Sequence, residues 1–320
     1  MNGFYFNFKE YLSVLANNNN FFDLINPNLV NTYIYNCQTY FEISVTFKIN
    51  FVNTTFETVT KNIVFIAGVE QLENFKKNEV YLNQNTFCLL PITPETNNTN
   101  YIKYWQGYPF DISVIEKTNS ILKLTNESNL IDFDFLITQK SNRLFFCDGS
   151  NDNIINDIVP LTQGVNKCTI NNSNLIIDFE PNPCGGIYLK WLNNYGGYSY
   201  WLFSDYYQKN NQYKNIGELK RDFENLENTF APTTQLGKKT NQSIDFVVDN
   251  INEMELSVIE TLLESPKVFL YKGQPFSRGA AKDWIEVRVD TSKATIRNFK
   301  GQPVKIGFSL ELPEKENITL

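Results

Sequence analysis

The chain has 320 residues, of which 42% are apolar and 15% aromatic, and this is enough to bury two separate cores. It contains no His, which excludes Ser-His-Asp and Cys-His catalysis and His-ligated zinc or haem. A formal net charge of -7 argues against the basic face that sequence-specific nucleic-acid binding needs.

The first twenty residues lack the basic segment and apolar core of a secretory signal, and no apolar run approaches the roughly 18 residues of a membrane span. We therefore expect a protein made in a cytoplasm, without a membrane partner. The cysteines are odd in number, widely separated and without a C-x-x-C pair, so we expect reduced core residues. They are Cys37, Cys88, Cys147, Cys168 and Cys184.

Residues 1–34 are expected to form an N-terminal arm, and a strictly alternating segment, "FEISVTFKINF", follows at residues 41–51. Its apolar side chains face one way and its polar side chains the other, which is typical of a half-buried antiparallel strand. Shorter strand-like runs follow between clusters of Asn, Gly, Pro, Asp and Thr: "NIVFIAG", "FCLLPIT", "FDISVI", "ILKL", "IDFDFLI", "RLFFCD" and "NLIIDFE". This pattern predicts a jelly-roll-like β-sandwich over residues 35–203.

That domain ends in a predicted aromatic hairpin. "GIYLKWLN" and "YSYWLF" flank Asn194–Gly197, and paired glycines supply the positive φ of a tight turn. The pair Gly185–Gly186 indicates a bulge or a close backbone approach. We expect the hairpin's aromatic side chains to form core or subunit contacts, with Tyr195 and Tyr198 as candidates for an exposed sugar-stacking platform. The aromatic set is Trp191, Tyr195, Tyr198, Tyr200 and Trp201.

Residues 204–242 are predicted to be an exposed linker that carries an amphipathic helix. The helix is indicated by apolar residues at intervals of three and four. They are Ile216, Leu219, Phe223, Leu226 and Phe230.

Residues 243–320 are predicted to form a smaller β-α-β-β-β module, a sandwich or open sheet with one packed helix. "SIDFVV" is a strand, and "NINEMELSVIETLLES" is a helix with Asn250 or Asn252 as N-cap and Pro266 at its end. "KVFLY", "WIEVRV" and "VKIGFSLELP" are strands. The long loop Lys272–Asp283 is expected to reach a partner.

Candidate sites for chemistry are weak. Asp148 and Asp152 in "CDGSNDN" resemble a calcium loop, but the EF-hand order is missing and the twelfth position is Val159, so a turn is favoured. Asp132 and Asp134 resemble a glycosidase carboxylate pair, but their spacing places both on the polar face of a strand. "FSRGAAKDW" lacks P-loop spacing. We therefore predict no enzyme, no cofactor, and no catalytic, cofactor-binding or metal-binding residue.

Several stretches resemble the virion tail proteins of tailed phages that infect Bacteroidetes, the crAss-like phages included. These are "YWQGYPFDIS" (Tyr104–Ser113), "GGIYLKWLNNYGGYSYWLF", "SPKVFLY", "WIEVRV" and the end "LPEKENITL". The resemblance covers most of residues 60–320 and is clearest from Cys184 onward. It implies ring or distal-tail subunits, with the C-terminal module as a tail-tube-like β-sandwich or sheet, and it carries over no catalytic residue.

The sequence therefore predicts a mainly β structural protein of a phage tail, assembled in the host cytoplasm. It would form a homo-oligomeric ring around the DNA ejection channel and a platform for neighbouring ring, portal-side or fibre proteins. The ring contact is expected from the C-terminal module. The alternative is a carbohydrate-binding adhesin that recognises host surface glycans through the aromatic hairpin.

Overall fold

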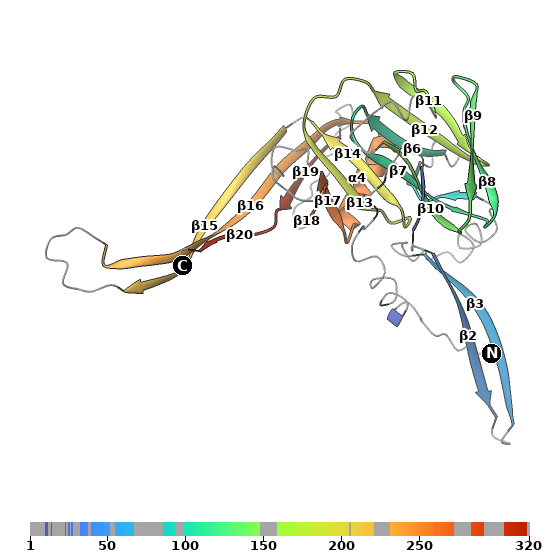
Figure 1. Ribbon diagram of the computed structural model, residues 1–320, viewed down its shortest axis with the longest axis horizontal. Coiled ribbons are helices and arrows are strands. Elements are labelled where there is room, and N and C mark those ends of the chain that lie inside the picture. Colours follow the sequence, from blue (N-terminus) through green and yellow to red (C-terminus); the bar gives the residue numbers. More distant parts are fainter. Residues whose placement is uncertain are drawn as a thin grey trace. The chain divides into compact units, whose positions relative to one another are not determined.

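The computed structural model describes residues 33–37, 40–51, 55–66, 86–93, 99–147, 159–204, 206–220, 231–271, 283–290 and 304–318, and single residues between 10 and 27. As predicted, the fold is mainly β, with several sheets and, among the described residues, one helix (Figure 1). The chain divides into two compact units. The first comprises Met1–Pro183, Leu192–Tyr200 and Ser257–Ser265, and the second Cys184–Trp191, Trp201–Leu256 and Pro266–Leu320.

The first unit contains a four-stranded and a six-stranded sheet. The four-stranded sheet has the order β1 (Ile34–Asn36), β10 (Ser141–Cys147), β7 (Phe110–Glu116), β4 (Thr86–Cys88). The six-stranded sheet has the order β5 (Ile92–Thr93), β6 (Thr99–Trp105), β12 (Ser173–Glu180), β11 (Gly164–Ile170), β8 (Ser120–Asn126), β9 (Ile131–Ile137). Strands β6 and β12 are parallel, and the other pairs are antiparallel.

Aromatic side chains from both sheets meet in the core of this unit. The ring centroids of Tyr104 on β6 and Phe110 on β7 are 4.7 Å apart, and Phe110 stacks on Phe146 at 5.1 Å. Strands β7 and β10 are buried over nearly their whole length, whereas β8 and β9 alternate between buried and exposed side chains. This is the packing of a β-sandwich, in which two inner faces share one core.

The alternating segment at residues 41–51 forms strand β2 (Tyr40–Asn50), as predicted, in an antiparallel pair with β3 (Phe56–Ile66). Among the described strands, these two pair only with each other. The expected half-burial is wrong for the outer part of β2, where Phe47 is 37% and Ile49 44% exposed. The reason is that no further described strand widens this ribbon into a sheet with a covered face.

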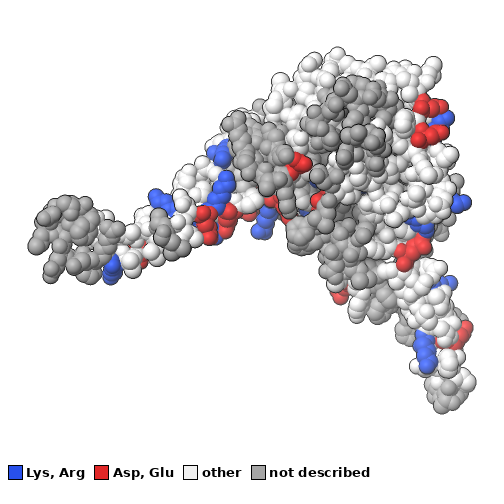
Figure 2. All heavy atoms as spheres, in the orientation of Figure 1, with Lys and Arg blue, Asp and Glu red and all other residues white. Residues whose placement is uncertain are grey.

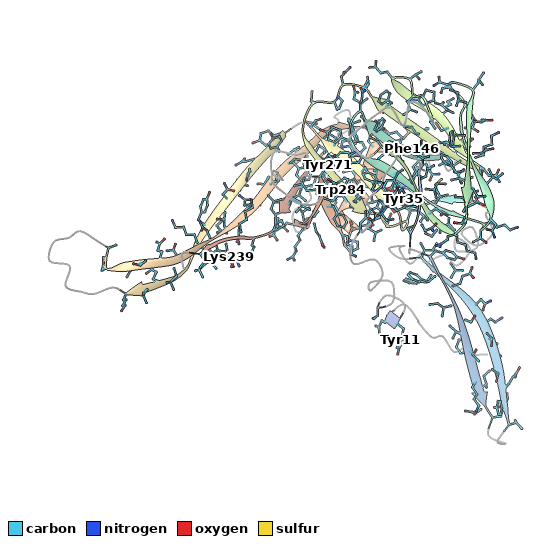
Figure 3. All side chains as sticks on the ribbon, viewed as in Figure 1. Tyr11, Tyr35, Phe146, Lys239, Tyr271 and Trp284 are labelled. Carbon is cyan, nitrogen blue, oxygen red and sulfur yellow. The ribbon has the colours of Figure 1, made fainter. Side chains whose placement is uncertain are left out.

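A larger sheet, most of it in the second unit, has the order β14 (Tyr198–Phe203), β13 (Ile187–Leu192), β17 (Val268–Tyr271), β18 (Trp284–Asp290), β19 (Val304–Glu311), β16 (Thr233–Ile251), β15 (Tyr206–Lys220); β20 (Lys315–Ile318) also pairs with β16. Its core includes the rings of Phe203, Phe246 and Phe308, with Phe246 and Phe308 stacked at 5.3 Å. Tyr271 and Trp284 lie side by side on neighbouring strands, with centroids 5.1 Å apart (Figure 3).

The predicted helix in the linker 204–242 is wrong for its described residues. Ile216 and Leu219 lie on strand β15, which pairs with β16 from Tyr206 to Lys220, while Phe223, Leu226 and Phe230 lie outside the described residues. The register shifts on both sides of Gly217. Such a bulge adds a residue to one strand and breaks the period of two, so the apolar spacing resembles that of a helix.

The remaining elements of the C-terminal module are confirmed. Helix α4 (Glu253–Glu264) lies between β16 and β17, and three of the predicted strands are β17, β18 and β19. Asn252 is the N-cap: the backbone N–H of Glu255 donates to its Oδ1 at 2.9 Å, and its own N–H donates to Glu255 Oε2 at 3.1 Å. This reciprocal pair is a capping box. Residues 272–282 of the predicted partner loop lie outside the described residues.

Candidate functional site

The two acidic candidates are on a solvent-exposed strand face, as predicted. Asp132 and Asp134 are exposed on β9, and Asp132 Oδ2 lies 2.6 Å from Lys123 Nζ. This hydrogen bond lowers the pKa of Asp132. Asp148 and Asp152 lie outside the described residues, as does most of "FSRGAAKDW". Within the described part of the chain, no group of three or more Cys, Asp or Glu could hold a metal ion.

The aromatic hairpin lies in the protein interior. Trp191, Tyr198, Tyr200 and Trp201 are each at most 7% exposed, which confirms the prediction of core residues over a sugar-stacking surface. Tyr195, at the turn, is half-buried. On this hairpin, only Tyr195 therefore remains as a candidate for stacking against a glycan.

A buried Asn, which sequence reasoning missed, organises the turn of this hairpin. Asn193 Oδ1 accepts from the N–H groups of Tyr195 (3.0 Å) and Gly197 (3.1 Å), and its Nδ2 donates to Leu89 O at 3.1 Å. Gly196 has φ of 90°, as the paired glycines predicted. In a chain so rich in Asn, only its place directly before the turn distinguished Asn193.

The first unit contains a buried, hydrogen-bonded cluster of charged side chains. Arg143 on β10 is 2% exposed. Its Nε and Nη2 donate to Asp111 Oδ2 and Oδ1 at 2.7 and 2.6 Å, and its Nη1 donates to Asp23 Oδ1 at 2.8 Å. The Tyr200 hydroxyl donates to Asp111, and the ring of Tyr198 lies 4.3 Å from the guanidinium carbon. Such paired, bidentate geometry is what allows charges to be buried.

The pKa directions in the cluster follow from burial and from the carboxylates. Burial acts to lower the pKa of Arg143, but the attraction of Asp111 and Asp23 outweighs it and the pKa lies well above its usual value. Burial, followed by the charge of Asp111, raises the pKa of Tyr200. Both carboxylates are engaged by the one cation, so the cluster anchors Asp23, a residue of the predicted N-terminal arm, to the sandwich.

The cysteines are only partly core residues. All five lie in described segments and none forms a disulfide; Cys88, Cys147 and Cys168 are buried, Cys37 is half-buried and Cys184 is exposed. The prediction of a core residue is therefore wrong for Cys184, which lies in the irregular segment before β13 and not on a strand.

Buried thiols make the protein sensitive to alkaline pH. Burial raises the pKa of Cys88 from 9.0 to about 12, and that of Cys168 also to about 12. The folded state therefore keeps these protons while the unfolded chain loses them, so stability is full below about pH 9 and falls as the pH rises toward 12. Between pH 9 and 11, the raised pKa of Cys88 alone should lower the free energy of unfolding by about 2 kcal/mol.

Urea unfolding at pH 8 to 11, followed by Trp fluorescence, tests this expectation. The wild-type midpoint should fall along the series, and Cys88→Ala should show a shallower fall from a lower starting value. A wild-type midpoint that stays constant up to pH 11 contradicts the expectation.

The β15–β16 hairpin exposes apolar side chains along an edge strand. Strand β15 has 15 residues and pairs, among the described strands, only with β16, so it is the edge strand of the described sheet. Figure 2 shows Lys or Arg and Asp or Glu interspersed on the visible face of the protein, without a broad field of one sign. The hairpin's exposed apolar residues are Tyr206, Tyr207, Tyr213, Ile216, Leu219 and Leu236.

The surface of the β2–β3 ribbon is the second candidate for an interaction. Phe47, Ile49, Phe51 and Phe56 are all between 37% and 62% exposed.

No described helix is long and apolar enough to cross a membrane. Comparison with protein-family models, with curated proteins and with solved structures finds no match to this chain.

Proposed function

We propose that the protein is a structural subunit of a phage tail that forms a closed homo-oligomeric ring around the DNA ejection channel. The ring would also be a platform for neighbouring ring, portal-side or fibre proteins of the virion. The proposal starts from the resemblance of Tyr104–Ser113 and of the segments after Cys184 to virion tail proteins. The observation that carries it is the β15–β16 hairpin, whose long edge strand exposes Tyr213, Ile216 and Leu219.

Physical arguments connect this hairpin to assembly. A long edge strand presents unpaired backbone groups, and exposed apolar side chains beside it favour contact with another chain. Closed rotational symmetry needs a heterologous interface, in which one surface of each subunit meets a different surface of the next. A net charge of -7 keeps the lumen from binding DNA tightly, so that a polyanion can slide.

The adhesin is less well supported. Its platform was to be the aromatic hairpin, and four of the five aromatic residues there are at most 7% exposed. Tyr195 alone is too small a surface for the stacked aromatic contacts that such a site requires.

Negative-stain electron microscopy of the purified protein tests the proposal, with sedimentation velocity as the quantitative measurement. We expect closed rings in the wild type. Tyr213→Ser with Ile216→Ser should weaken association at least about tenfold, because apolar contacts at the centre of an interface carry most of its energy.

Gln212→Ser, at an exposed polar position of the same strand, is the matched control and should assemble like the wild type. Wild-type protein that stays monomeric at every concentration contradicts the proposal. Glycan binding by such a monomer would favour the adhesin.

A further inference from the structure

The β2–β3 ribbon is amphipathic through its middle. The cross-strand pairs Phe41–Phe65, Val45–Lys61, Phe47–Val59 and Ile49–Glu57 lie on one face, because side chains directly opposite each other in an antiparallel pair share a face. The other face is polar through its middle. There Ser44 Oγ donates to Asn62 Oδ1 at 2.7 Å, and the hydroxyls of Thr46 and Thr60 are 3.1 Å apart.

The ribbon is longer than an isolated hairpin can support. Each strand has 11 residues, and neither pairs with another described strand. A two-stranded hairpin alone in water is at best marginally stable, and a covered apolar face is what stabilises it. Here the apolar face becomes more exposed toward the tip, at Phe47 and Ile49. The structure thus predicts that another surface covers this face.

The charges on the apolar face indicate what that surface is. Glu57 and Lys61 are four residues apart on β3, about 13 Å at the usual rise per residue, which is too far for them to pair with each other. Phe47 and Val59 lie midway between them. If a second ribbon lies face to face and antiparallel, centred on Phe47 and Val59, each Lys61 lies over the other copy's Glu57.

We propose that the apolar face of the β2–β3 ribbon packs on the same face of a second copy of this chain across a two-fold axis. The contact forms a four-stranded sandwich with Phe47 and Val59 at its centre, Val45 over Ile49, and two symmetric Lys61–Glu57 ion pairs. The face is complementary to its own copy, because apolar side chains meet apolar side chains and each Lys61 meets a Glu57. A two-fold interface requires this.

The size of the contact defines its role. The ribbon is about 36 Å long and two strands wide, so the pair buries less than the 1,200–2,000 Å² of a stable interface. The contact therefore adds to others, and in this respect the inference rests on the proposed ring. Because it is two-fold, it would join subunits of two facing rings and not neighbours within one ring.

A charge swap tests the register by sedimentation velocity over a range of concentrations. Lys61→Glu and Glu57→Lys each place like charges opposite each other and should weaken the ribbon contact about tenfold or more. The double variant restores opposite charges and should return to within about twofold of the wild type. Lys48→Glu, near the tip but on the opposite face, is the control and should associate like the wild type. Single variants that behave like this control, or a double variant without recovery, overturn the inference.

Cross-linking tests the two-fold axis, because a residue on the axis meets its own copy. In a Cys184→Ser background, Val59→Cys should give dimers with a short bismaleimide, and the adjacent Thr58→Cys, on the opposite face, should stay at the level of the background protein. Rings by electron microscopy without this cross-link overturn the ribbon pair and leave the ring. Cross-linked dimers that never form rings overturn the ring and leave the ribbon pair.

Discussion

Replacing Arg143 by Met is expected to lower the free energy of unfolding by about 3–5 kcal/mol. The substitution keeps much of the side-chain volume but removes the cation that lies between Asp111 and Asp23, whose side chains are 0% and 5% exposed. Two carboxylates are then left buried without a counter-charge. The hydrogen bond that Asp111 accepts from the Tyr200 hydroxyl does not neutralise its charge. An uncompensated buried charge costs far more than an intact buried pair contributes.

Urea unfolding of three variants separates this effect from the loss of packing. Arg288→Met, at an exposed position of β18, is the matched control and should change stability by no more than about 0.5 kcal/mol. Adding Asp111→Asn to Arg143→Met removes one of the two uncompensated charges and should recover part of the loss. A single Arg143→Met variant as stable as Arg288→Met would show that the cluster contributes little.

The sequence predicted those elements whose pattern is local. Strands β2, β18 and β19 alternate in sequence, and β9 places Asp132 on its exposed face as the period of two requires. Helix α4 begins after Asn252, one of the two predicted N-cap candidates, where Asn252 and Glu255 satisfy each other three residues apart. Glycine pairs also marked the turn at Gly196 correctly.

Elements whose pattern is interrupted were missed. Strand β11 was not predicted because Asn166, on its inward face, is polar; its amide donates to Thr162 O at 2.7 Å and Gly164 O at 2.9 Å, which satisfies it inside the sandwich. Strand β15 was assigned to a helix because its bulge at Gly217 disturbs the alternation. The amide of Asn166 also donates to Ile177 O on β12 at 3.3 Å, and β15 is paired with β16 along its length. The pattern of a single strand contains neither contact.

The charge cluster could not be predicted from the sequence for a similar reason. Arg143 meets partners 32 and 120 residues away, and neither Asp111 nor Asp23 carries a local signal of burial. Strand β10 itself was predicted, but a cation within it is ordinarily placed on a solvent-exposed face. The exposed apolar surface of β2 was missed for the opposite reason: its apolar residues were expected to be covered within the chain, and at the tip they are exposed.

Replacing Gly197 by Ala is expected to destabilise the protein by about 3 kcal/mol, the upper end of what overpacking usually costs. A Cβ at this position would overlap the backbone oxygen of Leu89 and lie 2.9 Å from its Cβ. The neighbouring segment cannot move away without cost, because Leu89 O also accepts from Asn193 Nδ2 and Leu89 N donates to Ser113 O at 2.8 Å. The whole turn of the hairpin must therefore shift.

The control for Gly197→Ala is Gly185→Ala, because a Cβ on Gly185 meets no atom within 4 Å. It should change the urea midpoint little, within about 0.5 kcal/mol in free energy. The strain should also be local, so hydrogen exchange at the Gly197 amide, which donates to Asn193 Oδ1 at 3.1 Å, should accelerate by more than the global loss of stability explains. If the two alanine variants unfold at the same urea concentration, the close approach of the hairpin turn to Leu89 does not constrain the fold.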